Sequence, residues 1–225
     1  MKNKALIGTL AALALLVVGV LFVSQRQETS SSSENQVVKI GILQFVTHDA
    51  LDEIERGIED GLADAGYEGS NVELTVLNAE ADQSKIQTMS KKLVDDGNDV
   101  VIGIATPAAQ GLASATSDIP VIMGAISDPV GAKLVKNLEE PEGNVTGVSN
   151  HVPHAQTVEL IQTITPDAKT IGVLYASSED NSVSQVKEFT QYAEEAGLTV
   201  VEYAVPSTNE ITTTMSVMTG KVDAI

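Results

Sequence analysis

The sequence has no cysteine and no tryptophan, and only seven of its 225 residues are aromatic. Without cysteine the chain has no disulfide, no thiolate nucleophile and no attachment point for an N-terminal lipid. Basic residues are also scarce, at 13 against 31 acidic ones, and the formal net charge is −18. Such a charge argues against binding to nucleic acid or to anionic lipid. We therefore expect a soluble exported body that is stabilised by its hydrophobic core.

Familiar catalytic signatures are absent as well. The chain has no Gly-x-Ser-x-Gly elbow, no Walker loop and no Gly-x-Gly-x-x-Gly fingerprint. Its histidines are His48, His151 and His154, and Pro153 interrupts the helix that would align the last two for a metal ion. A serine hydrolase would need a third partner that the sequence does not identify. We therefore expect no enzyme activity, no metal and no cofactor.

The first 36 residues differ in composition from the rest. Lys2 and Lys4 precede an apolar run over residues 5–23, and a polar segment rich in serine and glutamate follows. This order is typical of a targeting segment, and the run is close to the ~20 residues that span a bilayer as a helix. A cleaved signal and a retained membrane anchor with a serine-rich tether both stay open, and the anchor is favoured. The lysines before the run predict that the body lies outside the cytoplasm.

From residue 37 onward, short β-branched runs alternate with stretches of helical periodicity. Leu51, Ile54, Ile58 and Leu62 form the stripe of a helix over residues 50–65. A second helix follows Asp82, and a third begins at Thr106, which we interpret as its N-cap with Pro107 at the first helical position. A short helix is predicted to begin at residues 132–135. The predicted strands of this part are 38–43, 72–77, 100–104, 121–125 and 145–148.

The second part of the chain repeats the alternation. Strands are predicted over residues 170–175, 198–205 and 222–225. One helix has its apolar stripe at 158–164 and ends at Pro166, a second has its stripe at 183–193 and is closed by Gly197, and a third spans about 209–219. This order is typical of parallel, doubly wound α/β sheets. We therefore expect two such lobes, an N-terminal one over residues 37–149 and a C-terminal one over residues 150–225.

The two lobes also share sequence at a constant displacement of 131 positions. Ile40-Gly41 recurs as Ile171-Gly172, the run 64–66 recurs as 195–197, and Asn78 recurs as Asn209. Chance similarity between α/β sequences is the alternative, but the constant displacement favours a duplication. After a shorter second helix, residues 98–102 correspond to 221–225. Since the first half continues after this strand, we expect roughly 50 to 80 residues of the second lobe to be missing.

Ligands of open parallel sheets bind beyond the carboxyl ends of the strands, which selects the loops that follow them. Two of these loops begin a helix, where free N–H groups favour an anion such as a carboxylate. Asp128 or Glu179 is a candidate partner for an ammonium group, so an amino acid fits the pattern, as do other small polar ligands. For individual residues the alternative to ligand binding is a purely structural role, as a helix cap, in a turn or in the core. The candidate ligand-binding residues are Gln44, Phe45, Asn78, Thr106, Ala108, Ser127, Asp128, Glu179, Asn181 and Ser182.

Several short segments, taken in order, carry a family resemblance. They are 41–44 with His48 and Asp52, Asn78-Ala79 with Asp82, 105–109, 127–130, 144–149, and Leu174-Tyr175 with Glu179, Asn181 and Ser182. The chain resembles the extracytoplasmic solute-binding proteins of ABC transporters, and among them the tryptophan or aromatic amino acid type of Gram-positive bacteria. The resemblance covers residues 37–225.

The resemblance implies a fold and a function. It implies two lobes of the type I periplasmic binding protein kind, joined by a hinge near residues 149–153 and closing on an amino acid. Gln44, Thr106, Ser127-Asp128 and Asn181-Ser182 would then line the cleft. The ligand would pass to a membrane permease at the outer face of the membrane, and the complete receptor would be a monomer. Many relatives carry a lipid-anchored cysteine, whose absence here favours the anchor over residues 5–23. A sensory domain of a signalling system is the alternative function.

Overall fold

A computed structural model describes residues 37–225 and contains two separate parallel sheets. The first sheet has the strand order β2-β1-β3-β4-β5. Each predicted strand of this part is confirmed, with ends that differ by at most one residue. The strands are β1 (Val38–Gln44), β2 (Val72–Asn78), β3 (Val100–Ile104), β4 (Val121–Ile126) and β5 (Val145–Ser149).

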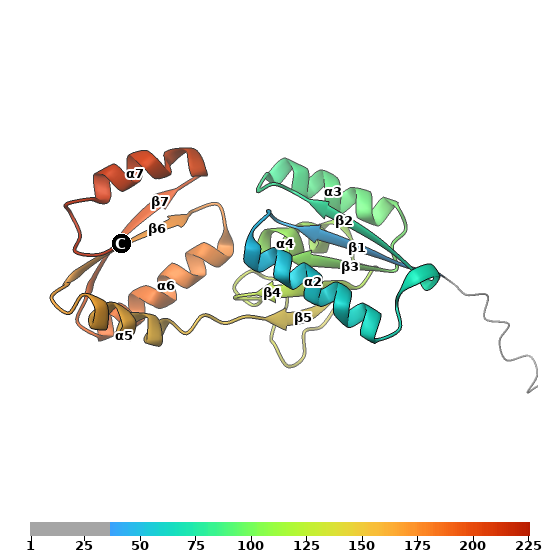
Figure 1. The fold of residues 1–225 in the computed structure, drawn as a ribbon, viewed down its shortest axis with the longest axis horizontal. Helices are drawn as coiled ribbons and strands as arrows, with labels where there is room; N and C mark the ends of the chain where they lie inside the picture. Colours follow the sequence, from blue (N-terminus) through green and yellow to red (C-terminus); the bar gives the residue numbers. More distant parts are fainter. Residues whose placement is uncertain (1–36) are drawn as a thin grey trace, which may run out of the picture. The chain divides into compact units, whose positions relative to one another are not determined.

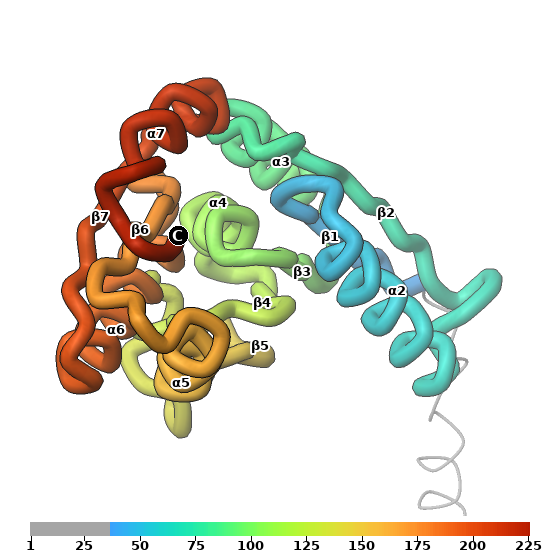
Figure 2. Tube along the Cα trace, turned by 60° about the vertical axis from the view of Figure 1, so that its left-hand side comes forward, coloured from blue at the N-terminus to red at the C-terminus, as the bar shows by residue number. Residues whose placement is uncertain are grey.

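Helices cover both faces of this sheet, as Figures 1 and 2 show. The apolar stripe of α2 (Asp49–Asp64) packs against Ile40, Ile42, Ile102 and Ile104. On the other face, α3 (Gln83–Asp95) and α4 (Thr106–Ala115) pack over Leu43 and Val101. Successive strand residues point to opposite faces, so the apolar β-branched runs serve both layers. The predicted doubly wound architecture is therefore present.

Two local predictions are wrong. Residues 132–135 form hydrogen-bonded turns rather than a helix, because Lys133 has φ +58° and the N–H groups of Leu134 and Val135 both donate to Pro129 O. Thr106 is not the N-cap of α4, since Ala105 holds that position with φ +74° and ψ +157°. Thr106 is instead the first helical residue and is buried.

The second sheet pairs β6 (Thr170–Ala176) with β7 (Thr199–Val205) in parallel. α5 (His154–Ile164) and α6 (Asp180–Glu195) lie on the same side of this sheet (Figure 1). They share with β6 a core that contains Val158, Ile171 and Phe189. α7 (Ile211–Met218) follows the short helix η2 (Thr208–Glu210). The predicted strand over residues 222–225 is reduced to two isolated parallel bridges, between Ala224 and Ile171 and between Val222 and Thr219. Residues 150–153 connect β5 to α5 (Figure 1).

The two sheets repeat one another in detail. α2 and α6 are displaced by 131 positions at both ends, and each is followed by a left-handed glycine, Gly66 (φ +87°) or Gly197 (φ +81°). A Cβ on Gly41 would lie 2.8 Å from Leu93 Cδ2, and one on Gly172 would lie 2.9 Å from Met218 Cε. Each sheet therefore needs a glycine at the same point of its first strand, where the second helix approaches closely.

The displacement of 131 does not extend through the whole repeat. Ile40 pairs with Leu74 whereas Ile171 pairs with Val200, so the second strands are displaced by 126 positions. Asn209 is therefore not the structural counterpart of Asn78, and that part of the prediction is wrong. The extra residues in the first half lie between α2 and β2 and include the short helix η1 (Gly69–Asn71).

A duplicated aspartate fixes the alignment of the third strands. Asp99 accepts from Lys39 N at 2.8 Å and donates its own N–H to Lys39 O. Asp223 does the same with Thr170, accepting from its N–H at 2.8 Å and donating to its carbonyl. Asp99 thus corresponds to Asp223, whereas the alignment of 98–102 with 221–225 is one residue out of register.

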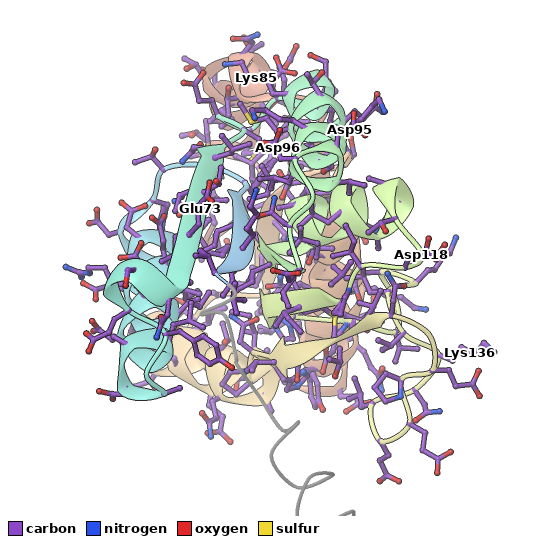
Figure 3. All side chains as sticks on the ribbon, turned by 90° about the vertical axis from the view of Figure 1, so that its right-hand side faces the viewer. Glu73, Lys85, Asp95, Asp96, Asp118 and Lys136 are labelled. Carbon is purple, nitrogen blue, oxygen red and sulfur yellow. The ribbon has the colours of Figure 1, made fainter. Side chains whose placement is uncertain are left out.

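Charged side chains lie on the outside of the described chain, as Asp118 and Lys136 show in Figure 3. Five Lys or Arg ion pairs occur within the described residues, and all of them involve exposed side chains. Exposed pairs of this kind contribute little to stability. No helix within residues 37–225 is long and apolar enough to cross a membrane. The apolar run over residues 5–23 lies outside the described part.

Candidate functional site

The strand order of the first sheet locates its candidate binding edge. Successive strands are added on one side of β1 as far as β2, and on its other side from β3 onward, so the strand order reverses between β1 and β3. These two strands are hydrogen-bonded parallel neighbours. Loops that follow two strands at such a switch point diverge and leave room for a ligand. Gln44 ends β1 and Thr106 begins the helix after β3, so both predicted residues flank this point. The second sheet repeats the arrangement, with β6 between β7 and Ala224.

Gln44 is a buried polar side chain whose amide orientation is determined by its neighbours. Its Nε2 donates to Asp52 Oδ1 at 2.6 Å and to Val46 O at 2.9 Å. Rotating the amide would place its oxygen against two acceptors, so this orientation is the only one that bonds both. Its Oε1 is buried and has no hydrogen-bond partner among the described residues. The end of β1 therefore holds an acceptor that a ligand N–H group can satisfy.

The other predicted residues near the switch point are mostly packed. Phe45 is part of the hydrophobic core, which is one of the two roles considered for it. Thr106 and Ala108 are buried as side chains, and Ala108 has no exposed surface. Asn78 is half-buried and donates to Thr47 Oγ1 at 3.1 Å, which ties the loops after β1 and β2 together. Only backbone groups of Thr106 and Ala108 remain to meet a ligand.

The start of α4 has a strained cap. Ala105 lies in a region of φ and ψ that is otherwise occupied almost only by glycine, at a typical cost of ~1–3 kcal/mol. Ala125 near the end of β4 also has a positive φ, of +61°. The α4 cap makes no side-chain hydrogen bond, and Pro107 in its first turn has no N–H. The N–H groups of Thr106 and Ala108 are thus left for another acceptor.

Glu179, Asn181 and Ser182 lie at the start of α6, beyond the end of β6. Glu179 is the N-cap residue and Asn181 lies in the first turn. Burial raises the pKa of the Glu179 carboxyl, and a hydrogen bond with the Asn181 side chain opposes this rise. Asn181 Oδ1 is buried with no partner among the described residues. This helix start therefore offers a second unsatisfied acceptor beside a half-buried carboxyl group.

Ser127 and Asp128 follow β4 and make contacts that the sequence does not indicate. Gln185 Nε2 donates to Ser127 Oγ at 3.2 Å, and Ser184 Oγ donates to Asp128 Oδ2. Asp128 Oδ1 also accepts from Gly131 N at 2.8 Å. Both oxygens of the Asp128 carboxylate are thus already bonded to groups of the chain.

Gln110, Ser184 and Gln185 are absent from the predicted site although they lie among its residues. Gln110 on α4 donates to Asp180 Oδ2 at 2.8 Å and to Ala132 O at 3.0 Å. Asp180 and Ser184 are four positions apart and so share one face of α6. That spacing was visible in the sequence, but the surface that this face meets was not.

A mostly apolar pocket lies beside β6, and the predicted site residue Ser182 is among the residues that line it. It has a volume of about 460 Å³ and is lined by Val173–Ala176 of β6 together with residues of α5 and α6. β6 bonds to β7 along its whole length on one edge, but on the other edge it has one bridge, at Ile171. An edge of this kind accepts a further strand.

A histidine cluster borders this pocket. His154 lines it and is buried, and its Nε2 lies 3.9 Å from Glu188 Oε2. His151 is exposed, with Nε2 3.3 Å from Glu188 Oε1. Burial lowers the pKa of His154, the Glu188 carboxylate opposes this effect, and His151 adds to it. The described residues contain no group of three or more side chains arranged to hold a metal ion.

Comparison with known proteins agrees with this architecture. Residues 39–225 match the family model described as ABC transporter substrate binding protein. The tyrosine-binding protein of Clostridioides difficile (strain R20291) is 40% identical over 226 residues, which cover 95% of this chain and 66% of that protein. The present chain therefore spans about two thirds of the length of this relative.

Two solved structures are informative. The first is described as an ABC domain in complex with L-Trp from Streptococcus pneumoniae and is 65% identical, with a TM-score of 0.83 over 84% of this chain and 64% of that one. The second is described as the ligand-free, open structure of a Clostridium difficile substrate binding protein, CD0873. It is 41% identical, with a TM-score of 0.60 over 83% of this chain and 64% of that one. Because the family match covers nearly all of the described residues, this chain belongs to the family of ABC transporter substrate-binding proteins.

Proposed function

We propose that this chain is the capturing part of an extracytoplasmic receptor that binds an aromatic amino acid and delivers it to an ABC permease. The observation that carries the proposal is the likeness to the L-Trp complex, at 65% identity and a TM-score of 0.83. The 40% identity with a tyrosine-binding protein supports the same class of ligand. The role is capture rather than catalysis, in keeping with the family and with a site that presents backbone amides and acceptor oxygens.

The α4 start is the proposed partner of the ligand carboxylate. Its first turn lies at the switch point between β1 and β3 and has no side-chain cap. The N–H groups of Thr106 and Ala108 point along the helix axis, and the positive end of the helix dipole favours an anion there. The strained Ala105 gives the chain the direction it needs to enter the helix at this point.

Glu179 is the proposed partner of the ligand ammonium, in preference to Asp128. Glu179 is half-buried and bonds to one neighbouring side chain, Asn181, whereas both oxygens of Asp128 are occupied. An ammonium group has three N–H donors. Gln44 Oε1 at the end of β1 and Asn181 Oδ1 at the start of α6 are two unsatisfied acceptors that such donors could meet. A nearby positive charge stabilises the ionised Glu179 and so offsets the effect of its burial.

The arrangement of the complete receptor follows from the same proposal. Residues 37–149 and 150–225 act as two lobes, and the connecting residues 149–153 serve as the hinge. Closing on a ligand buries both inner faces, and the permease recognises that closed form. Residues 5–23 hold the receptor at the outer face of the membrane, and it works as a monomer. Asn78, Ser127 and Ser182 border the site, and Phe45 supports it from the core.

Calorimetric titration of the full-length protein with a panel of solutes tests this function. We expect tryptophan, tyrosine or phenylalanine to bind, and sugars and nucleosides to give no heat. Replacing Glu179 by Gln should weaken amino acid binding by about 1.5–3 kcal/mol, the usual loss for a hydrogen bond to a charged group. Glu194→Gln, on an exposed position of the same helix, is the matched control and should bind as the parent does. Binding of sugars or nucleosides alone would refute the ligand class, and an unchanged affinity in Glu179→Gln would refute its assigned role.

A further inference from the structure

Three side-chain hydrogen bonds connect α4 and the loop after β4 with the first turns of α6. They join Ser184 to Asp128, Gln185 to Ser127 and Gln110 to Asp180. The donors and acceptors come from α4, from the loop after β4 and from α6, which are separated by 56 to 70 positions in the sequence. We call these six residues the interlobe latch.

The latch is built into the surrounding structure on its first-sheet side. Asp128 Oδ1 accepts from Gly131 N, and Asp128 O accepts from Ala132 N at 2.9 Å. Ala132 O in turn accepts from Gln110 Nε2, the same atom that donates to Asp180. One turn, residues 128–132, thus positions both Asp128 and Gln110 toward α6. A Cβ on Gly131 would lie 2.0 Å from Asp128 Oδ2, so a larger residue there would displace the Asp128 carboxylate from this position.

The second-sheet side uses a single helix face. Asp180 and Ser184 are one turn apart, and Gln185 lies beside Ser184. Ser127, Asp128, Ser184 and Gln185 are all half-buried, so their hydrogen bonds are partly shielded from water. The bond from Ser184 to the Asp128 carboxylate is charge-assisted, and such bonds are about twice as strong as neutral ones.

We propose that the interlobe latch holds the two lobes together and sets the affinity of the receptor through the population of its closed state. The proposal rests on the proposed function, and it makes Asp128 a positioning residue rather than a ligand contact. A ligand that binds only the closed form has an apparent Kd equal to its intrinsic Kd divided by the closed fraction. Loss of one latch bond lowers that fraction and weakens binding without touching the ligand.

Ser184→Ala is the most direct test because it removes one hydroxyl and keeps a good helix former. We expect it to raise the Kd for the aromatic amino acid by about tenfold, because the closed fraction of the free receptor falls. In a double-mutant cycle with Asp128→Ala, the two losses should be far from additive, since both remove the same bond. Gln191→Ala, on the same helix but bonded to Glu195, is the matched control and should leave the Kd unchanged.

A second measurement follows the lobes without any ligand. The sequence lacks cysteine, so Asp118→Cys and Glu194→Cys provide two unique sites for spin labels on exposed positions of the two lobes. Ser184→Ala should shift the distance distribution of the ligand-free full-length protein toward longer values. The latch would be overturned if Asp128→Ala weakened ligand binding while Ser184→Ala bound the ligand normally and left the spin-label distances unchanged.

The two proposals fail in different ways. If no aromatic amino acid binds to the parent protein, the proposed function is refuted. The spin-label distances still decide the latch in that case, because they need no ligand. Equal distances in the parent and in Ser184→Ala overturn the latch, whereas longer distances in the variant support it.

Discussion

At the scale of single residues, the sequence identified positions better than roles. Gln44, Thr106 and Asp128 were predicted at strand ends, and they lie there. Their side chains nevertheless differ in what they offer, since Thr106 is buried and Asp128 is bonded to the chain on both oxygens. Burial and hydrogen-bond partners depend on tertiary contacts, which residue type and local spacing do not determine. For this reason Glu179 and Asp128 were equal candidates from the sequence and are unequal in the structure.

His154 gives a prediction for the pH dependence of stability. Burial lowers its pKa in the folded state, so the unfolded chain binds a proton more readily than the folded one. The free energy of unfolding should therefore be highest above the ordinary histidine pKa of ~6.5 and fall as the pH drops through that value. Glu188 reduces this effect because it stabilises the protonated form. Urea unfolding curves between pH 7.5 and 5.5 measure the fall.

Two variants separate His154 from its neighbour. His154→Leu removes the buried titrating group and should flatten the decline between pH 7.5 and 5.5. His151→Gln should retain most of it, because the His151 side chain is 64% exposed. An identical slope in His154→Leu and in the parent would assign the pH dependence to other groups.

At the scale of helices and strands, periodicity predicted nearly all elements, and the misses have local causes. The stripe of α2, the glycine stops and the strand ends all depend on neighbours within a few positions. The absent helix at 132–135 and the displaced α4 cap depend on Lys133 and Ala105 with positive φ, which neither residue type suggests. The constant displacement of 131 located α6 correctly but failed beyond it, because the connections after the paired helices differ in length.

The duplicated glycines give a prediction for packing between elements. Gly172→Ala would place a methyl group 2.9 Å from Met218 and Val222 side chains, and Gly41→Ala one 2.8 Å from Leu93. Extra atoms in a packed core usually cost ~1–3 kcal/mol, so each variant should lower the free energy of unfolding by that amount. Denaturant titration measures the change.

A glycine in open space is the control for this pair. Gly57 lies in the interior of α2 with nothing within 4 Å of a Cβ built on it. Gly57→Ala should stabilise the protein by up to ~1 kcal/mol, because alanine is the better helix former. If Gly172→Ala were as stable as Gly57→Ala, the close approach of α7 to β6 would not restrict position 172 to glycine.

At the scale of the whole molecule, the described chain has two cores of unequal size. The first sheet buries side chains on both faces, in two clusters that include Leu43, Leu112 and Ile42. The second sheet has a smaller cluster around Val158, Ile171 and Phe189. Hydrophobic stabilisation grows with the apolar area that is buried. We therefore expect the second sheet and its helices to unfold at a lower urea concentration than the first.

The distribution of tyrosine makes this order measurable. Tyr175, Tyr192 and Tyr203 belong to the second sheet and its helices, Tyr67 is the one tyrosine of the first part, and tryptophan is absent. Tyrosine fluorescence should thus report mainly the earlier transition, and far-ultraviolet circular dichroism should report both. Two non-coincident curves exclude two-state unfolding of the chain, whereas superimposed curves would show that the two parts unfold as one cooperative unit. Phenylalanine, which does not mask tyrosine emission, should raise the earlier midpoint in the full-length protein, because a ligand held by both lobes stabilises the weaker one by mass action.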